Sequence, residues 1–166
     1  MATYNGQRFI REQLESLAAQ QHLPSELVIA DDASADETVA IAAEFARTAP
    51  FAVHVHRYCN RVGYRANFMR AASLCKSDVI AFCDQDDIWS PQKLALCTEP
   101  FQDSNVLLTY HNADVVTEAG ERLDSLDSLA SEPVTGPLAV SSVHNMPGPL
   151  GFTQLFRRSI LSFSPL

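Results

Sequence analysis

A dense group of carboxylates, Asp84, Asp86 and Asp87, follows the apolar run 79–83. Carboxylates this close repel one another, so they rarely share the end of a buried strand unless a cation compensates their charge. An Asp-x-Asp pattern at a strand end indicates a divalent metal ion, and a hard cation held by few protein oxygens usually also binds a phosphate. These residues therefore predict an enzyme that acts on a nucleotide or a phosphorylated metabolite.

A second acidic pair, Asp31 and Asp32, follows another short apolar run, 27–30. In open α/β sheets, ligands bind beyond the carboxyl ends of the strands. Both acidic groups fall at such ends. We therefore expect that they could line one cleft, although they are far apart in the sequence.

The elements that must position these residues follow from the hydrophobic pattern. Stretches with helical periodicity alternate with short β-branched runs, which predicts an α/β domain with a largely parallel sheet and helices on both faces. Residues 120–148 are rich in Ser, Pro, Gly and Asp, which predicts a mobile loop region. The expected helices are 7–20, 37–48, 65–75, 91–101 and one that begins within 157–161, and the expected strands are 27–30, 51–57, 79–83, one from 106, and 152–156.

Composition narrows the function further. The 166 residues suit one domain, and the net charge of −8 argues against a nucleic-acid binder, because phosphate backbones need clustered Lys and Arg. No polybasic segment, no apolar stretch of about 20 residues and no signal peptide is evident, so a cytoplasmic location is expected. The four cysteines form no C-x-x-C pair, which favours reduced thiols. The histidines show no metal-ligand spacing.

Four segments in order resemble the family 2 glycosyltransferases with the GT-A fold, and within them the bacterial rhamnosyltransferases and related enzymes of cell-surface polysaccharide synthesis. The resemblance runs from residue 1 to about residue 120, and more loosely to the end. It implies a Rossmann-like GT-A domain over residues 1–166, with a nucleotide-sugar (donor) binding half, 1–119, and a partial acceptor-side region, 120–166. The segments are 2–6 (Ala-Thr-Tyr-Asn-Gly), 28–34 (Val-Ile-Ala-Asp-Asp-Ala-Ser), 60–68 (Asn-Arg-Val-Gly-Tyr-Arg-Ala-Asn-Phe) and 83–94 (Cys-Asp-Gln-Asp-Asp-Ile-Trp-Ser-Pro-Gln-Lys-Leu).

The resemblance implies roles for residues that would bind the nucleoside. Ala2 and Tyr4 would line the base pocket, with the Tyr4 ring packed on the base. Asp32 would accept the base N–H, which suits the imide donor of uracil or thymine. Arg65 would lie near the nucleotide or its diphosphate.

The acidic segment would serve the diphosphate. By the same resemblance, Asp84 would reach the ribose or a metal-bound water, Gln85 would belong to the nucleotide-sugar site, and Asp86 would bind Mg²⁺ or Mn²⁺. The implied reaction moves a sugar from a UDP- or dTDP-sugar to a hydroxyl of a glycan or lipid-linked acceptor with inversion, while a carboxylate base takes the hydroxyl proton. A lipid-linked acceptor would allow peripheral association with the inner face of the membrane, which nothing in the sequence shows.

Two departures from the family pattern limit these expectations. In the family a central apolar strand precedes the segment 2–6, but here Met1 stands directly before it. The family's base is an Asp in an acidic motif that comes after a segment resembling 148–161, so the base is expected beyond Leu166. We therefore expect a domain without its first strand and its C-terminal part, which alone binds a nucleotide-sugar weakly and transfers sugar slowly or not at all. A catalytically inactive fragment or nucleotide-binding remnant is the alternative.

Two other kinds of site use a similar acidic pattern, but this sequence fits them less well. In phosphohydrolases of the haloacid-dehalogenase type, Thr or Val stands where Ile88 is found, and the motif lies near the chain start. An EF-hand needs Gly at the position of Trp89 and Glu at that of Ala95. Purely structural roles remain open: a turn cap for Asp32, core packing for Tyr4 and Trp89, a solvated helix start for Arg65, and charge at the helix near Pro91 for Asp87.

Overall fold

The computed structural model describes residues 1–117, 120–125 and 153–163, and their strands form two main sheets. The first sheet has the order β1-β2-β3, and all its strands are parallel. The second has the order β4-β8-β5, with β8 antiparallel to both neighbours. The strands are β1 (Ala2–Thr3), β2 (Glu26–Asp31), β3 (Ala52–Arg57), β4 (Val79–Ala81), β5 (Leu108–Tyr110) and β8 (Gln154–Arg157).

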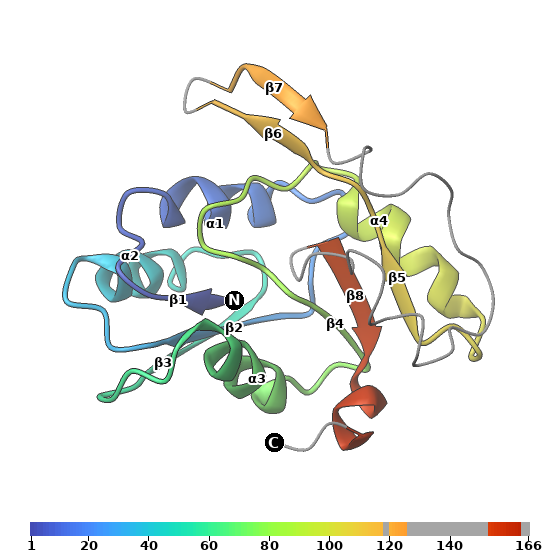
Figure 1. The fold of residues 1–166 in the computed structure, drawn as a ribbon, viewed down its shortest axis with the longest axis horizontal. Helices are drawn as coiled ribbons and strands as arrows, with labels where there is room; N and C mark the ends of the chain where they lie inside the picture. Colours follow the sequence, from blue (N-terminus) through green and yellow to red (C-terminus); the bar gives the residue numbers. More distant parts are fainter. Residues whose placement is uncertain (118–119, 126–152, 164–166) are drawn as a thin grey trace.

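Helices cover both faces of the parallel sheet, with α1 and α2 on one side and α3 on the other (Figure 1). Alternate residues of β2 explain this arrangement, because successive side chains of a strand point to opposite faces. Leu27 and Ile29 pack in the cluster that contains α1 and α2 residues, whereas Val28 and Ala30 pack with Ala71 of α3. The helices are α1 (Ile10–Ala18), α2 (Thr38–Phe45), α3 (Tyr64–Leu74) and α4 (Lys93–Thr98), with 3-10 helices η1 (Glu99–Gln102) and η4 (Arg158–Phe163).

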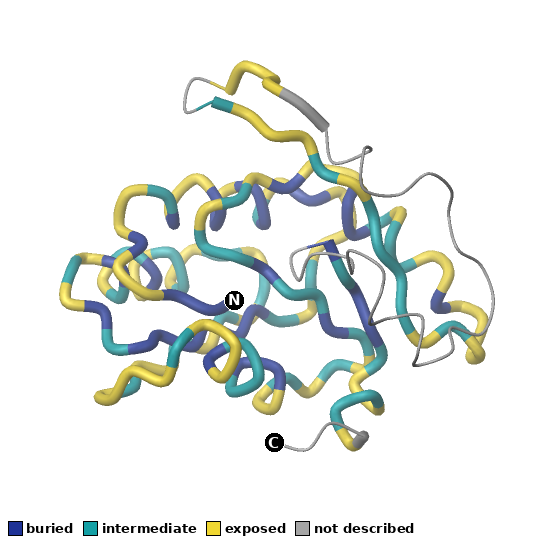
Figure 2. Tube along the Cα trace, in the orientation of Figure 1, coloured by how far each residue is buried: buried dark blue, intermediate teal, exposed yellow. Residues whose placement is uncertain are grey.

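The α/β class, the parallel sheet and the helices on both faces are confirmed, with four differences in detail. The helix expected to begin within 157–161 is the 3-10 helix η4, and Arg157 still belongs to β8. The expected helix 91–101 divides into α4 and the 3-10 helix η1, which contains Pro100, a residue that cannot donate the backbone hydrogen bond of a continuing α-helix. The last strand, β8, enters the second sheet antiparallel. The sequence did not predict the hairpin of β6 (Asp114–Val116) and β7 (Arg122–Ser125), in which β6 and residues 122–123 are exposed (Figure 2).

The parallel sheet contains one very short strand, β1. β1 has two residues, and just before it the Met1 amine donates a hydrogen bond to the carbonyl of Val28 at 2.7 Å. A pocket of about 310 Å³ lies beside Met1, between residues of β2 and β4, with Leu17, Trp89 and Leu155 in its lining. Of the expected loop 120–148, only residues 120–125 are described, and 126–148 lie outside the described residues. None of the described helices has the length and hydropathy that crossing a bilayer requires.

Candidate functional site

The carboxyl ends of β1 and β2, in the first sheet, and of β4, in the second, lie close together, and the predicted site residues follow them. Tyr4 comes directly after β1, and its backbone N–H donates to Oε1 of Gln85 at 2.9 Å. On the other side, the Asn5 N–H donates to Oγ of Ser34, after β2, at 2.9 Å. These hydrogen bonds bring the three predicted segments together.

The two adjacent aspartates after β2 have different partners. Asp31, the last residue of β2, is 1% exposed and stabilises the turn that follows the strand. Its carboxylate accepts the Ser34 N–H and the hydroxyls of Ser34 and Thr3. Asp32 is 2% exposed, and its two oxygens accept the N–H groups of Val62 and Gly63, each at 2.8 Å. Asp32 therefore fixes the segment that leads into α3 to the end of β2.

A third contact of Asp32 comes from α3. The Arg70 guanidinium lies 3.6 Å from its Oδ1, and the ring of Tyr58 lies 4.3 Å from the same guanidinium. The carboxylate is thus compensated by one cation and two backbone donors. A carboxylate has about four acceptor positions, so Asp32 retains capacity for a further donor.

Tyr4 carries an aromatic face at the edge of the site. Its side chain is 36% exposed, and the Arg61 guanidinium lies 3.8 Å from the ring centroid, within cation–π distance. The sequence did not single out Arg61, although it belongs to the segment 60–68. Ala2 is buried in β1, in register with Ala30. Arg65, in the first turn of α3, contacts the neighbouring Tyr64, with Nε donating to the hydroxyl at 3.1 Å.

The acidic segment after β4 combines burial with mutual repulsion. Burial, and then the charge of Asp86, raises the pKa of Asp84. Burial, followed by the charges of Asp84 and Asp86, raises the pKa of Asp87 to about 6. Oδ2 of Asp87 is buried without a hydrogen-bond partner, whereas Asp86 is exposed.

A buried cation, Lys93, lies next to this segment and was not predicted as a site residue. It is 8% exposed, its Nζ lies 3.7 Å from the Trp89 ring, and burial lowers its pKa to about 8. Trp89 is 6% exposed in the main core, and its backbone N–H donates to Oγ of Ser16 at 3.1 Å. The structural interpretation of Trp89 as a packing residue is therefore consistent with its surroundings.

The acidic segment suits a hard divalent cation by its donor chemistry. No three His, Cys, Asp or Glu side chains form a ready metal cage in the described part of the chain. However, Asp84, Asp86 and Asp87 offer oxygens whose charge is only partly compensated, and one of those oxygens has no partner. One or two carboxylates are enough to bind Mg²⁺ or a similar divalent cation when phosphates of the ligand and water molecules complete its coordination.

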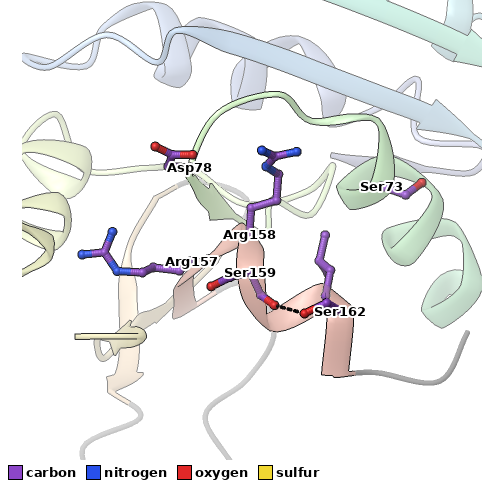
Figure 3. Close-up of a pocket in the computed structure, with 7 residues that line it drawn as sticks. Ser73, Asp78, Arg157, Arg158, Ser159 and Ser162 are labelled. Carbon is purple, nitrogen blue, oxygen red and sulfur yellow. Dashed lines mark hydrogen bonds between the residues drawn. The ribbon is translucent and has the colours of Figure 1, made fainter. Parts of the chain in front are cut away.

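A separate pocket of about 600 Å³ lies at the opposite end of β4, beside Asp78 (Figure 3). Arg157 and Arg158 contribute to its lining. The Arg157 guanidinium is engaged in the fold, because it donates to the carbonyls of Val106, Phe101 and Asp103. None of the predicted site residues lines this pocket.

Comparisons with known proteins agree with this architecture. The family model described as glycosyl transferase family 2 matches residues 1–163. The dTDP-rhamnosyl transferase RfbG of Shigella flexneri is 39% identical over 98 residues, which are 57% of this chain and 34% of that protein. The chain spans between 34% and 45% of the length of the curated relatives that it matches.

Solved structures share the fold. The Staphylococcus aureus protein TarS, residues 1–349 in complex with UDP, superposes with a TM-score of 0.69 and 24% identity over 98% of this chain and 46% of that one. The mannosyltransferase PcManGT of Pyrobaculum calidifontis, in complex with GDP-Man and Mn²⁺, gives a TM-score of 0.70 and 20% identity over 98% of this chain and 44% of that one. Both likenesses concern the fold.

Proposed function

This chain belongs to glycosyl transferase family 2, and we propose that its described residues form the donor side of a site that transfers a sugar from UDP or dTDP to an acceptor hydroxyl. The observation that carries the proposal is the hydrogen-bonded contact between Tyr4 and Gln85. This contact brings an aromatic residue next to the acidic segment, which supports a ligand that carries both a base and a diphosphate.

Each end of such a ligand has matching chemistry in the chain. At the base end, the exposed Tyr4 ring offers a stacking face, and Asp32 offers an acceptor for an imide N–H. The base of UDP or dTDP carries that donor. The names of similar proteins agree with a uracil or thymine nucleotide in the donor, because RfbG is a dTDP-rhamnosyl transferase and TarS is seen with UDP.

At the phosphate end, Asp86 with Asp84 would hold Mg²⁺ or Mn²⁺. When bound, such a cation neutralises the charge that develops as a nucleoside diphosphate leaves. PcManGT is seen with Mn²⁺ and a nucleotide-sugar, which supports the same arrangement here. The acceptor hydroxyl, of a glycan or lipid-linked sugar, would attack with inversion, and a carboxylate base would take its proton.

Metal-dependent nucleotide binding tests the proposal. We expect isothermal titration of the chain with UDP to show higher affinity with Mn²⁺ than with EDTA, because Asp86 and Asp84 would hold a cation that offsets the phosphate charge. The substitution Asp86→Ala should reduce the affinity in Mn²⁺ by roughly tenfold or more, since losing about 1.4 kcal/mol corresponds to one decade.

The matched control is Asp78→Ala, which removes an exposed carboxylate at the other end of β4. That variant should bind UDP as the wild type does. Equal Mn²⁺-dependent affinity in Asp86→Ala and the wild type would count against the metal assignment.

A further inference from the structure

The Gln85 side chain pairs with the backbone of Tyr4 through both of its amide atoms. The Tyr4 N–H donates to Oε1 at 2.9 Å, and Nε2 donates to the Tyr4 carbonyl at 3.1 Å. An amide side chain with one donor and one acceptor reproduces the pairing that a neighbouring strand would offer. The contact joins residues that are 81 positions apart in the sequence.

The amide of Gln85 occupies space that only a glycine at position 6 leaves open. A Cβ built on Gly6 would lie 2.2 Å from Oε1, 2.4 Å from Cδ and 2.9 Å from Nε2 of Gln85. Real Cβ atoms do not approach other atoms so closely, so Gly6 and Gln85 depend on each other sterically.

The backbone of Gly6 is held in place by its own hydrogen bonds. Its N–H donates to Oγ1 of Thr38 at 2.8 Å, and its carbonyl accepts the N–H groups of Phe9 and Ile10 at the start of α1. A methyl group at this position could therefore be relieved mainly by displacing the Gln85 side chain.

We propose that Gln85 is a positioning residue, whose amide, seated on Gly6, fixes the acidic segment at a set spacing from Tyr4. The inference rests on the proposed function and sharpens it. Gln85 lies between Asp84 and Asp86 in the chain, so a restraint on its side chain restrains both carboxylates. A nucleoside diphosphate would then meet a stacking face and a metal-binding segment already at the spacing that it needs, which lowers the cost of ordering on binding.

The test measures the metal-linked gain, which is the ratio of UDP affinity in Mn²⁺ to UDP affinity in EDTA. Gln85→Ala should reduce this gain by about fivefold or more, because the phosphate end is no longer held against the base end. The affinity in EDTA should fall by less than the affinity in Mn²⁺, because the residues at the base end are still present. The midpoint of thermal unfolding should fall only slightly, because the two hydrogen bonds that are lost are exposed. Gln102→Ala, an exposed glutamine in η1, is the matched control and should change neither quantity.

Gly6→Ala should cause a similar loss by displacing the amide. In the double variant G6A/Q85A the clash partner is absent, so its gain should equal that of Gln85→Ala alone and not the product of the two losses.

Three results would overturn the inference. In the first two, Gln85→Ala leaves the metal-linked gain unchanged, either because neither affinity falls or because both fall equally with and without Mn²⁺. The third is fully additive losses in the double variant. If the wild type shows no Mn²⁺-dependent binding of UDP, the proposed function fails as well, whereas a wild-type gain that Gln85→Ala retains overturns the positioning role alone.

Discussion

Individual side chains at the carboxyl ends of the strands hold the backbone of neighbouring segments in place. Asp32 is the clearest case, because both of its oxygens accept N–H groups of the segment before α3. Gly63, at the N-terminal cap of α3, has φ of 87°, a conformation that glycine adopts without strain. The carboxylate thus stabilises a backbone turn, while the backbone N–H of Asp32 donates to the carbonyl of Thr3, the residue before Tyr4, at 2.9 Å.

Removal of the Asp32 carboxylate should destabilise the fold. In Asp32→Ala the N–H groups of Val62 and Gly63 lose their acceptors and Arg70 loses its anionic partner. We expect the free energy of unfolding to fall by roughly 1–3 kcal/mol, the cost of leaving partly buried donors unpaired. Urea unfolding followed by circular dichroism measures this change.

The variant Asp32→Asn distinguishes the contribution of the hydrogen-bond acceptor to stability from the contribution of the charge. Its amide oxygen can still accept one N–H, so the loss should be smaller than in the alanine variant. If both variants unfold at the wild-type urea concentration, the structural role of Asp32 is wrong.

At the scale of elements, one carboxylate connects the start of β2 to the turn between α3 and β4. Oε1 of Glu26 accepts the N–H groups of Lys76 and Ser77 at 2.7 and 2.9 Å and the Ser77 hydroxyl at 3.0 Å. Burial alone would raise the pKa of Glu26, but these hydrogen bonds outweigh it and lower the pKa below its ordinary value. The charged form is therefore favoured in the folded protein.

This shift makes the contact sensitive to acid. A carboxyl group whose pKa is lowered on folding stabilises the protein fully above its unfolded pKa of 4.5, and the stabilisation is lost as pH falls through the lower folded value. We expect Glu26→Gln to cost up to about 1 kcal/mol near neutral pH, since the side chain is only partly buried, and clearly less at about pH 3. Urea unfolding of both proteins across this pH range provides the measurement, and a gap that widens toward acid would contradict the assignment.

The sequence was sufficient to predict those helices and strands that have a strong local pattern. The strand 27–30 and its acidic end were predicted because an apolar β-branched run with Asp after it is a local signal, and β2 confirms both. The antiparallel entry of β8 was not predictable in this way, because its partners β4 and β5 come from distant parts of the chain. The β6–β7 hairpin was missed since its residues, such as Val115 and Val116, are exposed and give no clear burial pattern.

The candidate site shows the same division. The placement of Tyr4, Asp32 and the acidic segment at strand ends follows from local pattern and sheet geometry. The pairing of Gln85 with the Tyr4 backbone does not, because nothing near Gln85 in the sequence indicates which distant backbone its amide will meet. Lys93 was missed for a related reason, since a lysine in a helix start is ordinarily expected in solvent and here it lies beneath an indole.

At the scale of the whole molecule, one hydrophobic core joins the two sheets. Ile29 of β2, Leu14 of α1, Leu94 of α4 and Leu155 of β8 belong to the same buried cluster. Smaller buried clusters lie against α3, but the main cluster contains residues of both sheets. A shared core of this kind predicts that both sheets unfold together.

Leu155 offers a direct test of this cooperativity. Its side chain is 1% exposed, so Leu155→Ala should lower the free energy of unfolding by roughly 2–4 kcal/mol through lost burial and a residual cavity. The fluorescence of Trp89, the single tryptophan, reports on the core. Far-ultraviolet circular dichroism reports on the helices, most of which pack on the parallel sheet. Both signals should shift by the same amount, whereas Leu123→Ala, at a leucine that is 67% exposed in β7, should shift neither. A fluorescence transition that moves while the dichroism transition stays in place would show instead that the two sheets unfold independently.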